Sequence, residues 1–193
     1  VLTMLRYTLA TTIVTTFDGL DTSNVDGGSI DIRSDLTFTA SLTISGTVAI
    51  TSSTGATLDG GGSRRLFFVD NDAVLVLSSL TLRGGYMGDG GAVNVAGTFT
   101  ATGCSFTSNS AYGSNANGGS AGGAVYVSGI FTAADCLFTT NTAFLWKSGG
   151  DGGKGNGGAI FIDGGALVAT GCAFSGNSAA SSGGGVRVWV GTM

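Results

Sequence analysis

Three cysteines, spaced 32 and 36 residues apart, are the side chains best suited to chemistry in this sequence: Cys104, Cys136 and Cys172. Thiols form disulfides, bind zinc or carry out redox chemistry. The chain has no histidine and no Cys-x-x-Cys spacing, which argues against zinc. No cation lies near them in the sequence to lower a thiol pKa, and three cysteines cannot all pair. We therefore expect buried free thiols that act as small apolar side chains.

Aspartates are the second candidates, since the chain has no glutamate. Asp70 and Asp72 have the ligand type to hold Ca²⁺ together with backbone carbonyls, although a capped turn is the favoured interpretation. Catalytic triads and histidine acid–base chemistry are excluded, and no aspartate spacing indicates the paired carboxylates of a glycosidase. The sequence therefore predicts no enzyme activity, no cofactor and no metal. A polysaccharide lyase is the alternative.

The cysteines belong to a segment that recurs three times, from a glycine pair to an asparagine. A phenylalanine and an asparagine follow each cysteine at fixed distances: Phe106, Phe138, Phe174, Asn109, Asn141 and Asn177. Between the copies lie Gly-, Ser- and Asn-rich tracts of unequal length, 110–121, 142–156 and 178–182. A body of constant length with variable loops predicts a solenoid whose copies stack.

Apolar and polar residues alternate within each copy, with Val93, Val95 and Phe99 on one face of the first. This alternation predicts short, half-buried strands rather than helices. A copy of about two dozen residues suits one turn, or rung, of a parallel β-helix. The pattern continues upstream through four leucines: Leu75, Leu77, Leu80 and Leu82.

Two regions are expected in the chain. Residues 1–28 fit the pattern poorly and should form a leading segment or cap over the first open edge. Residues 29–193 should form an all-β, single-stranded, right-handed parallel β-helix of about six or seven rungs. The chain begins without Met and stops in mid-pattern, so we expect it to be part of a longer one.

Pairing of Gly-Gly-Ala-Val or Gly-Gly-Ala-Ile with Phe-x-x-Asn resembles the repeats of the chlamydial polymorphic membrane proteins. The stretch ATLDGGGSRRLFFVDNDAVLVLSSLTLRGG is similar to the first rungs of pectate-lyase-like right-handed β-helix surface proteins. Together these motifs cover roughly residues 40–190. The resemblance implies a cell-surface protein with a structural or adhesive role, and it is more specific for architecture than for activity.

Repeated polar residues are expected at the bends between strands. The three asparagines should adopt the left-handed conformation and bond both the backbone and the asparagine of the next rung. The glycine pairs should supply positive φ angles or allow close approach between rungs.

An outward column is predicted from the middle position of the first strand in each rung, and we name it the stripe: Phe67, Asn94, Tyr126, Phe161 and Arg187. In this alignment Leu66 and Phe68 face inward. Aromatic rings of this kind stack on sugars or are buried by a partner, and in pectate-lyase-like enzymes the equivalent groove holds polysaccharide. Cover by the protein's own loops is an equal alternative. Three loop residues favour a partner, because apolar side chains there are costly to leave in water: Phe144, Leu145 and Trp146. Lys147 beside them is the fourth expected loop contact.

Charge and hydropathy exclude several functions. A net charge of −4 and a pI near 4.4 give no basic surface for nucleic acid or anionic membranes. The apolar runs are too short for a transmembrane helix. Outward threonines such as Thr98, Thr100 and Thr102 are typical of ice binding, but only half of the aligned positions keep Thr, which disfavours it.

We therefore expect a non-enzymatic, glycine-rich module outside the cell or on its surface. It should present a lateral face and its loops to a partner, or assemble into a surface structure. The expected partners are other protein subunits, further copies of the chain, or an extracellular glycan. An open edge on the last rung favours end-to-end stacking. The alternative is a polysaccharide-binding or polysaccharide-cleaving β-helix that uses the stripe.

Overall fold

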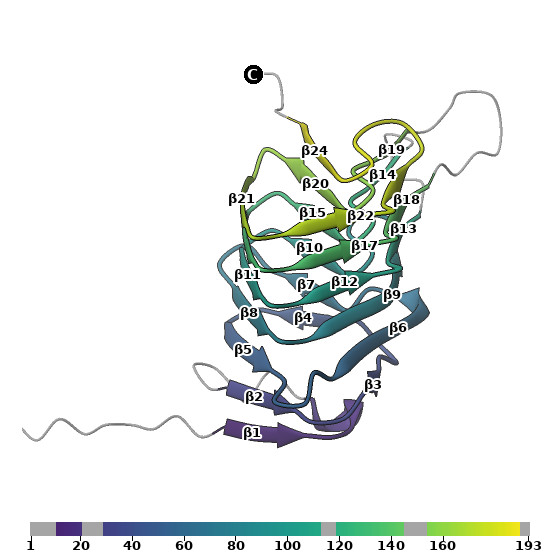
Figure 1. Ribbon diagram of the computed structural model, residues 1–193. Coiled ribbons are helices and arrows are strands. Elements are labelled where there is room, and N and C mark those ends of the chain that lie inside the picture. The colour runs from purple at the N-terminus through teal and green to yellow at the C-terminus, as the bar shows by residue number, and fades with distance from the viewer. Residues whose placement is uncertain (1–10, 21–28, 113–118, 145–153, 190–193) are drawn as a thin grey trace, which may run out of the picture.

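The computed structural model describes residues 11–20, 29–112, 119–144 and 154–189. They form strands that stack turn upon turn along one axis, as Figure 1 shows. Neighbouring strands are parallel and belong to equivalent positions of successive turns. The described residues therefore form a parallel β-helix, as expected. Among them, no helix is long and apolar enough to span a bilayer.

Three long sheets and one short sheet make up the β-helix. The seven-stranded sheet contains β1 (Thr11–Val14), β2 (Ser29–Ile32), β5 (Thr47–Thr51), β8 (Val74–Ser78), β11 (Thr98–Thr102), β16 (Ile130–Ala134) and β21 (Ala166–Thr170). The six-stranded sheet contains β4 (Leu42–Ile44), β7 (Phe67–Val69), β10 (Val93–Val95), β15 (Val125–Val127), β20 (Ile160–Asp163) and β24 (Val186–Trp189).

The nine-stranded sheet contains β3 (Leu36–Thr37), β6 (Thr57–Arg64), β9 (Thr81–Met87), β12 (Ser105–Thr107), β13 (Ser110–Ala111), β17 (Leu137–Thr139), β18 (Thr142–Ala143), β22 (Ala173–Ser175) and β23 (Ser178–Ala179). The short sheet joins β14 (Gly119–Ala121) to β19 (Lys154–Asn156). One strand of the seven-stranded sheet comes from each rung, so the described residues form seven rungs, within the range expected.

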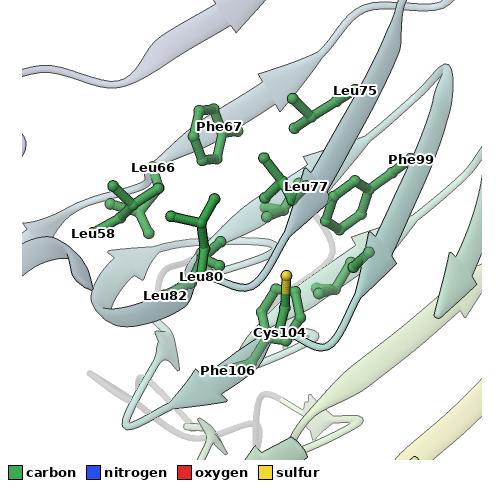
Figure 2. Close-up of a cluster of buried hydrophobic side chains, with 14 of the residues drawn as sticks. Leu58, Leu66, Phe67, Leu75, Leu77, Leu80, Leu82, Phe99, Cys104 and Phe106 are labelled. Atoms are coloured by element: carbon green, nitrogen blue, oxygen red, sulfur yellow. The ribbon is translucent and has the colours of Figure 1, made fainter. Parts of the chain in front are cut away.

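Identical side chains stack on one another inside the β-helix. Phe106 lies on Phe138 and Phe138 on Phe174, with ring centroids 4.8 Å apart in both pairs. Phe99 and Phe131 stack in the same way at 4.7 Å. Burial of each such ring contributes about 1.5–3 kcal/mol relative to exposure. Figure 2 shows the upstream part of this core, where leucines take over: Leu58, Leu66, Leu75, Leu77, Leu80 and Leu82.

Each glycine pair is needed for two different reasons. The first glycine has a left-handed backbone, with a φ of 66° at Gly122, which a residue with a side chain adopts only at a cost. The second glycine approaches the next rung closely. A Cβ on Gly123 would lie 2.1 Å from the Gly158 carbonyl oxygen. Both properties expected of the pairs are confirmed.

The repeated asparagines form a buried ladder along the axis. Asn141 Nδ2 donates to Asn177 Oδ1 at 3.0 Å and to the Phe106 carbonyl at 2.9 Å. Asn141 Oδ1 accepts from the backbone N–H and from the Nδ2 of Asn109, both at 3.0 Å. The predicted bonding from asparagine to backbone and to the next asparagine is confirmed.

The prediction that the asparagines adopt the left-handed conformation is wrong. This conformation lies one residue earlier, at Ser108, Thr140 and Gly176, with φ angles of 53°, 52° and 62°. The left-handed residue turns the chain at the corner, and the asparagine that follows directs its amide into the interior. The conformation is therefore imposed by the corner even where a serine or threonine must adopt it.

Strand pairing begins before the boundary expected at residue 29. β1 pairs with β2 in parallel, from Thr11 beside Ser29 onwards. The short 3-10 helix η1 (Phe17–Gly19) and the residue after it cover the adjoining end of the core. Leu20 is buried, and the Phe17 ring centroid lies 4.8 Å from that of Phe38. The described part of the leading segment thus contributes a strand as well as a cover.

Inward side chains of the last described rung are partly exposed. Phe174 is 37 % exposed, whereas Phe138 one rung earlier is fully buried. No described strand lies beyond β21, β22 and β24. The described β-helix therefore has a covered first end and an open last edge.

Replacing Asn141 with Ala should lower the free energy of unfolding by about 2–4 kcal/mol. The change leaves the Asn109 N–H and the Phe106 carbonyl buried without these partners. Urea unfolding followed by circular dichroism measures the loss. Asn177→Ala is the control, because water reaches the half-buried end of the ladder and should reduce the cost to about half. Equal costs at the two positions would contradict the buried ladder as the cause.

Candidate functional site

Ionisable side chains in the described residues form pairs rather than clusters. Within the described part of the chain, no group of three or more acidic, histidine or cysteine side chains is placed to hold a metal ion. Arg83 contacts the Asp59 carboxylate at 2.8 Å on the nine-stranded sheet. The calcium candidates Asp70 and Asp72 lie in a tight turn, where the Ala73 N–H donates to the Asp70 carbonyl at 3.0 Å. The turn favoured from the sequence is therefore present.

The three cysteines lie in one inward column and are free thiols. Cys104 and Cys136 are buried, and Cys172 is half-buried on the last rung. The Cys136 thiol donates to the Ala134 carbonyl at 3.3 Å. A hydrogen bond with Cys104, together with burial, raises the pKa of Cys136 above the ordinary thiol value. The thiolate form of Cys136 is therefore disfavoured.

The stripe begins at Phe68, so the prediction that Phe67 faces outward is wrong. Strand pairing places Phe68 beside Asn94. Phe67 is fully buried, and Figure 2 shows its ring in the leucine-rich core. Leu66 occupies the corner position that Ala92 holds one rung later, and both residues are fully buried. A buried corner residue followed directly by an inward strand residue shifts the alternation by one position, which places Phe68 outside.

With this correction the stripe has five members: Phe68, Asn94, Tyr126, Phe161 and Arg187. Tyr126 and Phe161 stack on each other, with centroids 5.8 Å apart and planes inclined by 17°. Phe161 is only 7 % exposed. The Tyr126 hydroxyl donates to the Asp163 carboxylate, and the Arg187 guanidinium lies 5.3 Å from the Trp189 ring centroid. The two stacked rings thus cover each other's faces, which leaves little ring face for a sugar.

A second aromatic cluster, which the sequence analysis missed, is formed by a residue of β9 and by the residues that directly follow β13 and β18. Tyr86 and Tyr112 stack at 5.3 Å, and Tyr112 meets Phe144 edge-on at 6.5 Å. Met87 beside them is 46 % exposed. We name these four residues the aromatic corner. Tyr112 and Phe144 each follow a repeated asparagine by three residues, and that spacing was the signal that could have found them.

The aromatic corner also contains the one predicted loop contact that the structure describes. Phe144 ends the described segment after β18 and is 45 % exposed. Leu145, Trp146 and Lys147 lie outside the described residues. Strands β13 and β18 reach this corner on the right of Figure 1. The half-buried Tyr112 and the exposed Phe144 therefore directly follow paired strands.

Comparison with known proteins found no relative of this chain. No family model matches the chain, and neither a curated protein nor a solved structure matches it. The strand topology defines the class of protein, a parallel β-helix. The resemblance to polymorphic membrane proteins and pectate-lyase-like proteins stays a prediction from the repeats. Function must therefore be argued from the surfaces.

At most one thiol of the native protein should react quickly with Ellman's reagent. Cys104 and Cys136 are buried, so that only Cys172 is reachable. Unfolding in guanidinium should expose all three. The Cys172→Ala variant is the control and should remove the fast reaction. Fast reaction of two or more thiols in the native wild-type protein would contradict the inward column.

Tyr126 should ionise last among the described tyrosines. Burial, together with the acceptor Asp163, raises the pKa of Tyr126 above its usual value of 10.0. Because the raised pKa belongs to the folded state, the stabilisation is present below pH 10 and is lost as the pH rises from there towards the folded-state pKa. Tyr126→Phe should therefore cost about 1 kcal/mol of unfolding free energy at neutral pH, with a smaller difference above pH 10.

Ultraviolet titration of the phenolates and urea unfolding on both sides of pH 10 test this prediction. Tyr112→Phe is the control, since it leaves the bond between Tyr126 and Asp163 intact. If the phenolate step at the highest pH in the wild-type protein is still present in Tyr126→Phe, that step does not belong to Tyr126 and the prediction is wrong.

Proposed function

We propose that the chain is a non-enzymatic structural or adhesive module, outside the cell or on its surface, that presents its aromatic corner and loops to a partner. One observation carries the proposal: the recurring residues face inward, whereas aromatic side chains are grouped beside the tracts of unequal length, with Phe144 45 % exposed. The phenylalanine, cysteine and asparagine columns face inward, as Phe138, Cys136 and Asn141 illustrate. The unequal tracts at 110–121 and 142–156 lie between the constant bodies.

Rigid support makes the aromatic corner suitable for binding. Tyr112 and Phe144 follow strands β13 and β18, which pair with each other from Ser110 beside Thr142. Rings held on paired strands lose little conformational entropy when a partner covers them. Aromatic and methionine side chains are also those enriched at the centres of protein interfaces. These properties support contact with another protein subunit or with the apolar face of a glycan.

The alternative function is a polysaccharide-binding or polysaccharide-cleaving β-helix that uses the stripe. Its support is the presence of Tyr126, Phe161 and Arg187 on successive rungs. Against it stands the mutual stacking of the two rings, with Phe161 only 7 % exposed. The two functions differ in what they require. The first needs the aromatic corner, and the second needs the stripe.

Incubation with a panel of polysaccharides and added Ca²⁺ should release no reducing or unsaturated sugar. Binding of the labelled chain to intact cells and to a glycan array should fall at least tenfold in Phe144→Ser. Leu137→Ser is the matched control on another face, because Leu137 is 50 % exposed and Phe144 is 45 % exposed. Sugar release, or binding that depends on Phe161 rather than Phe144, would favour the alternative.

External protease applied to producing cells tests the location. A tagged chain outside the cell or on its surface should be degraded while the cells remain intact. Full protection from the protease would contradict an extracellular role.

A further inference from the structure

The outer face of the seven-stranded sheet has no charged side chain over five consecutive rungs. Strands β5, β8, β11, β16 and β21 each direct three alternate side chains outward. All of these positions hold Thr, Ser, Ala, Val or Ile. The central column runs through Val76, Thr100, Thr132 and Val168 in direct register. We name this surface the neutral face, and its strands lie on the left of Figure 1.

Charged side chains lie on the outer sides of the other two long sheets and next to the neutral face on β2, where Asp31 pairs with Arg33. The nine-stranded sheet holds the Asp59–Arg83 ion pair, and Arg187 lies on the six-stranded sheet. Two residues of the neutral face are well exposed, Ile130 at 51 % and Val168 at 57 %. Charged residues on exposed strands ordinarily prevent association between sheets. Their absence over five rungs points to a face that is covered in the working protein.

The chemistry of the neutral face selects its occupant. The face lacks aromatic, amide and carboxylate groups, which bind sugars, and it lacks the cations that bind nucleic acid or anionic lipid. Small and β-branched side chains on in-register strands suit packing of one sheet on another, at a spacing of about 10 Å. A second copy brings the same uncharged surface into a two-fold contact without like-charge repulsion.

The dimensions of the neutral face indicate how strong this contact should be. The five strands of the neutral face, spaced by about 4.8 Å, with five residues rising about 3.3 Å each, span about 24 by 16 Å. Two such faces would bury about 800 Å² together, well below the 1,200–2,000 Å² of stable specific interfaces. The contact should therefore be weak and reversible.

We propose that the neutral face is a self-association surface through which two copies of this chain pack sheet against sheet. This proposal rests on the structural role proposed above and names its partner. In Figure 1 the neutral face and the aromatic corner lie on different sides of the β-helix. A pair of copies thus keeps both aromatic corners accessible.

Sedimentation equilibrium of the full chain, from about 5 µM to 1 mM, tests the proposal. Wild-type protein should show a monomer–dimer equilibrium. Ile130→Lys should weaken the dimer at least tenfold, because its ammonium would lose water in an uncharged interface. Leu137→Lys is the matched control, since Leu137 lies on the same rung, faces outward from the nine-stranded sheet and is 50 % exposed, against 51 % for Ile130. It should leave the dimer unchanged.

Thr132→Lys repeats the test at the centre of the face, in case Ile130→Lys fails to fold, and circular dichroism checks the fold of each variant. A wild-type chain that stays monomeric at 1 mM overturns the proposal. So does a dimer that survives both substitutions or is lost in Leu137→Lys. Monomeric protein that slows ice growth would assign the face to ordered water instead. None of these results alters cell binding by Phe144, so failure here is distinguishable from failure of the proposed function.

Discussion

In-register stacking of equivalent side chains is the interaction on which the rest of the structure depends. Rings repeat at 4.7 to 4.8 Å and asparagine amides bond at 3.0 Å along the same axis, because one strand spacing suits both contacts. An insertion within the stacked body would break the ladder at Asn141 and displace the ring of Phe138. The tracts whose length differs between copies accordingly lie outside this body, at 110–121 and 142–156.

The same constraint limits the chemistry of the outer surface. In stacked rungs, the nearest neighbours of an outward side chain are its own equivalents above and below. A catalytic group of unlike residues would require several successive rungs to diverge at one place. The described residues show such divergence as pairs, Tyr126 with Asp163 and Asp59 with Arg83. Broad uniform faces are the natural product of this architecture.

Redundancy explains what the sequence could predict. Three copies place cysteine, phenylalanine and asparagine at matching distances, so the register of β12, β17 and β22 followed directly. Phe67 was missed because Leu66, Phe67 and Phe68 are consecutive apolar residues, and alternation cannot tell which one occupies the corner. Ser108 and Thr140 are not residue types that signal a left-handed backbone. The aromatic corner could not be predicted without knowing where each strand ends, and strand propensity does not locate the ends of strands.

Each rung contacts only the rungs before and after it, and this has a consequence for how such a protein changes in evolution. Duplication of one repeat of 32 residues would extend the axis by about 4.8 Å and leave every existing contact type unaltered. The new copy would also bring its own tract between Ala111 and the next glycine pair. Axial length and the number of variable tracts therefore increase together, so a single genetic event changes both at once.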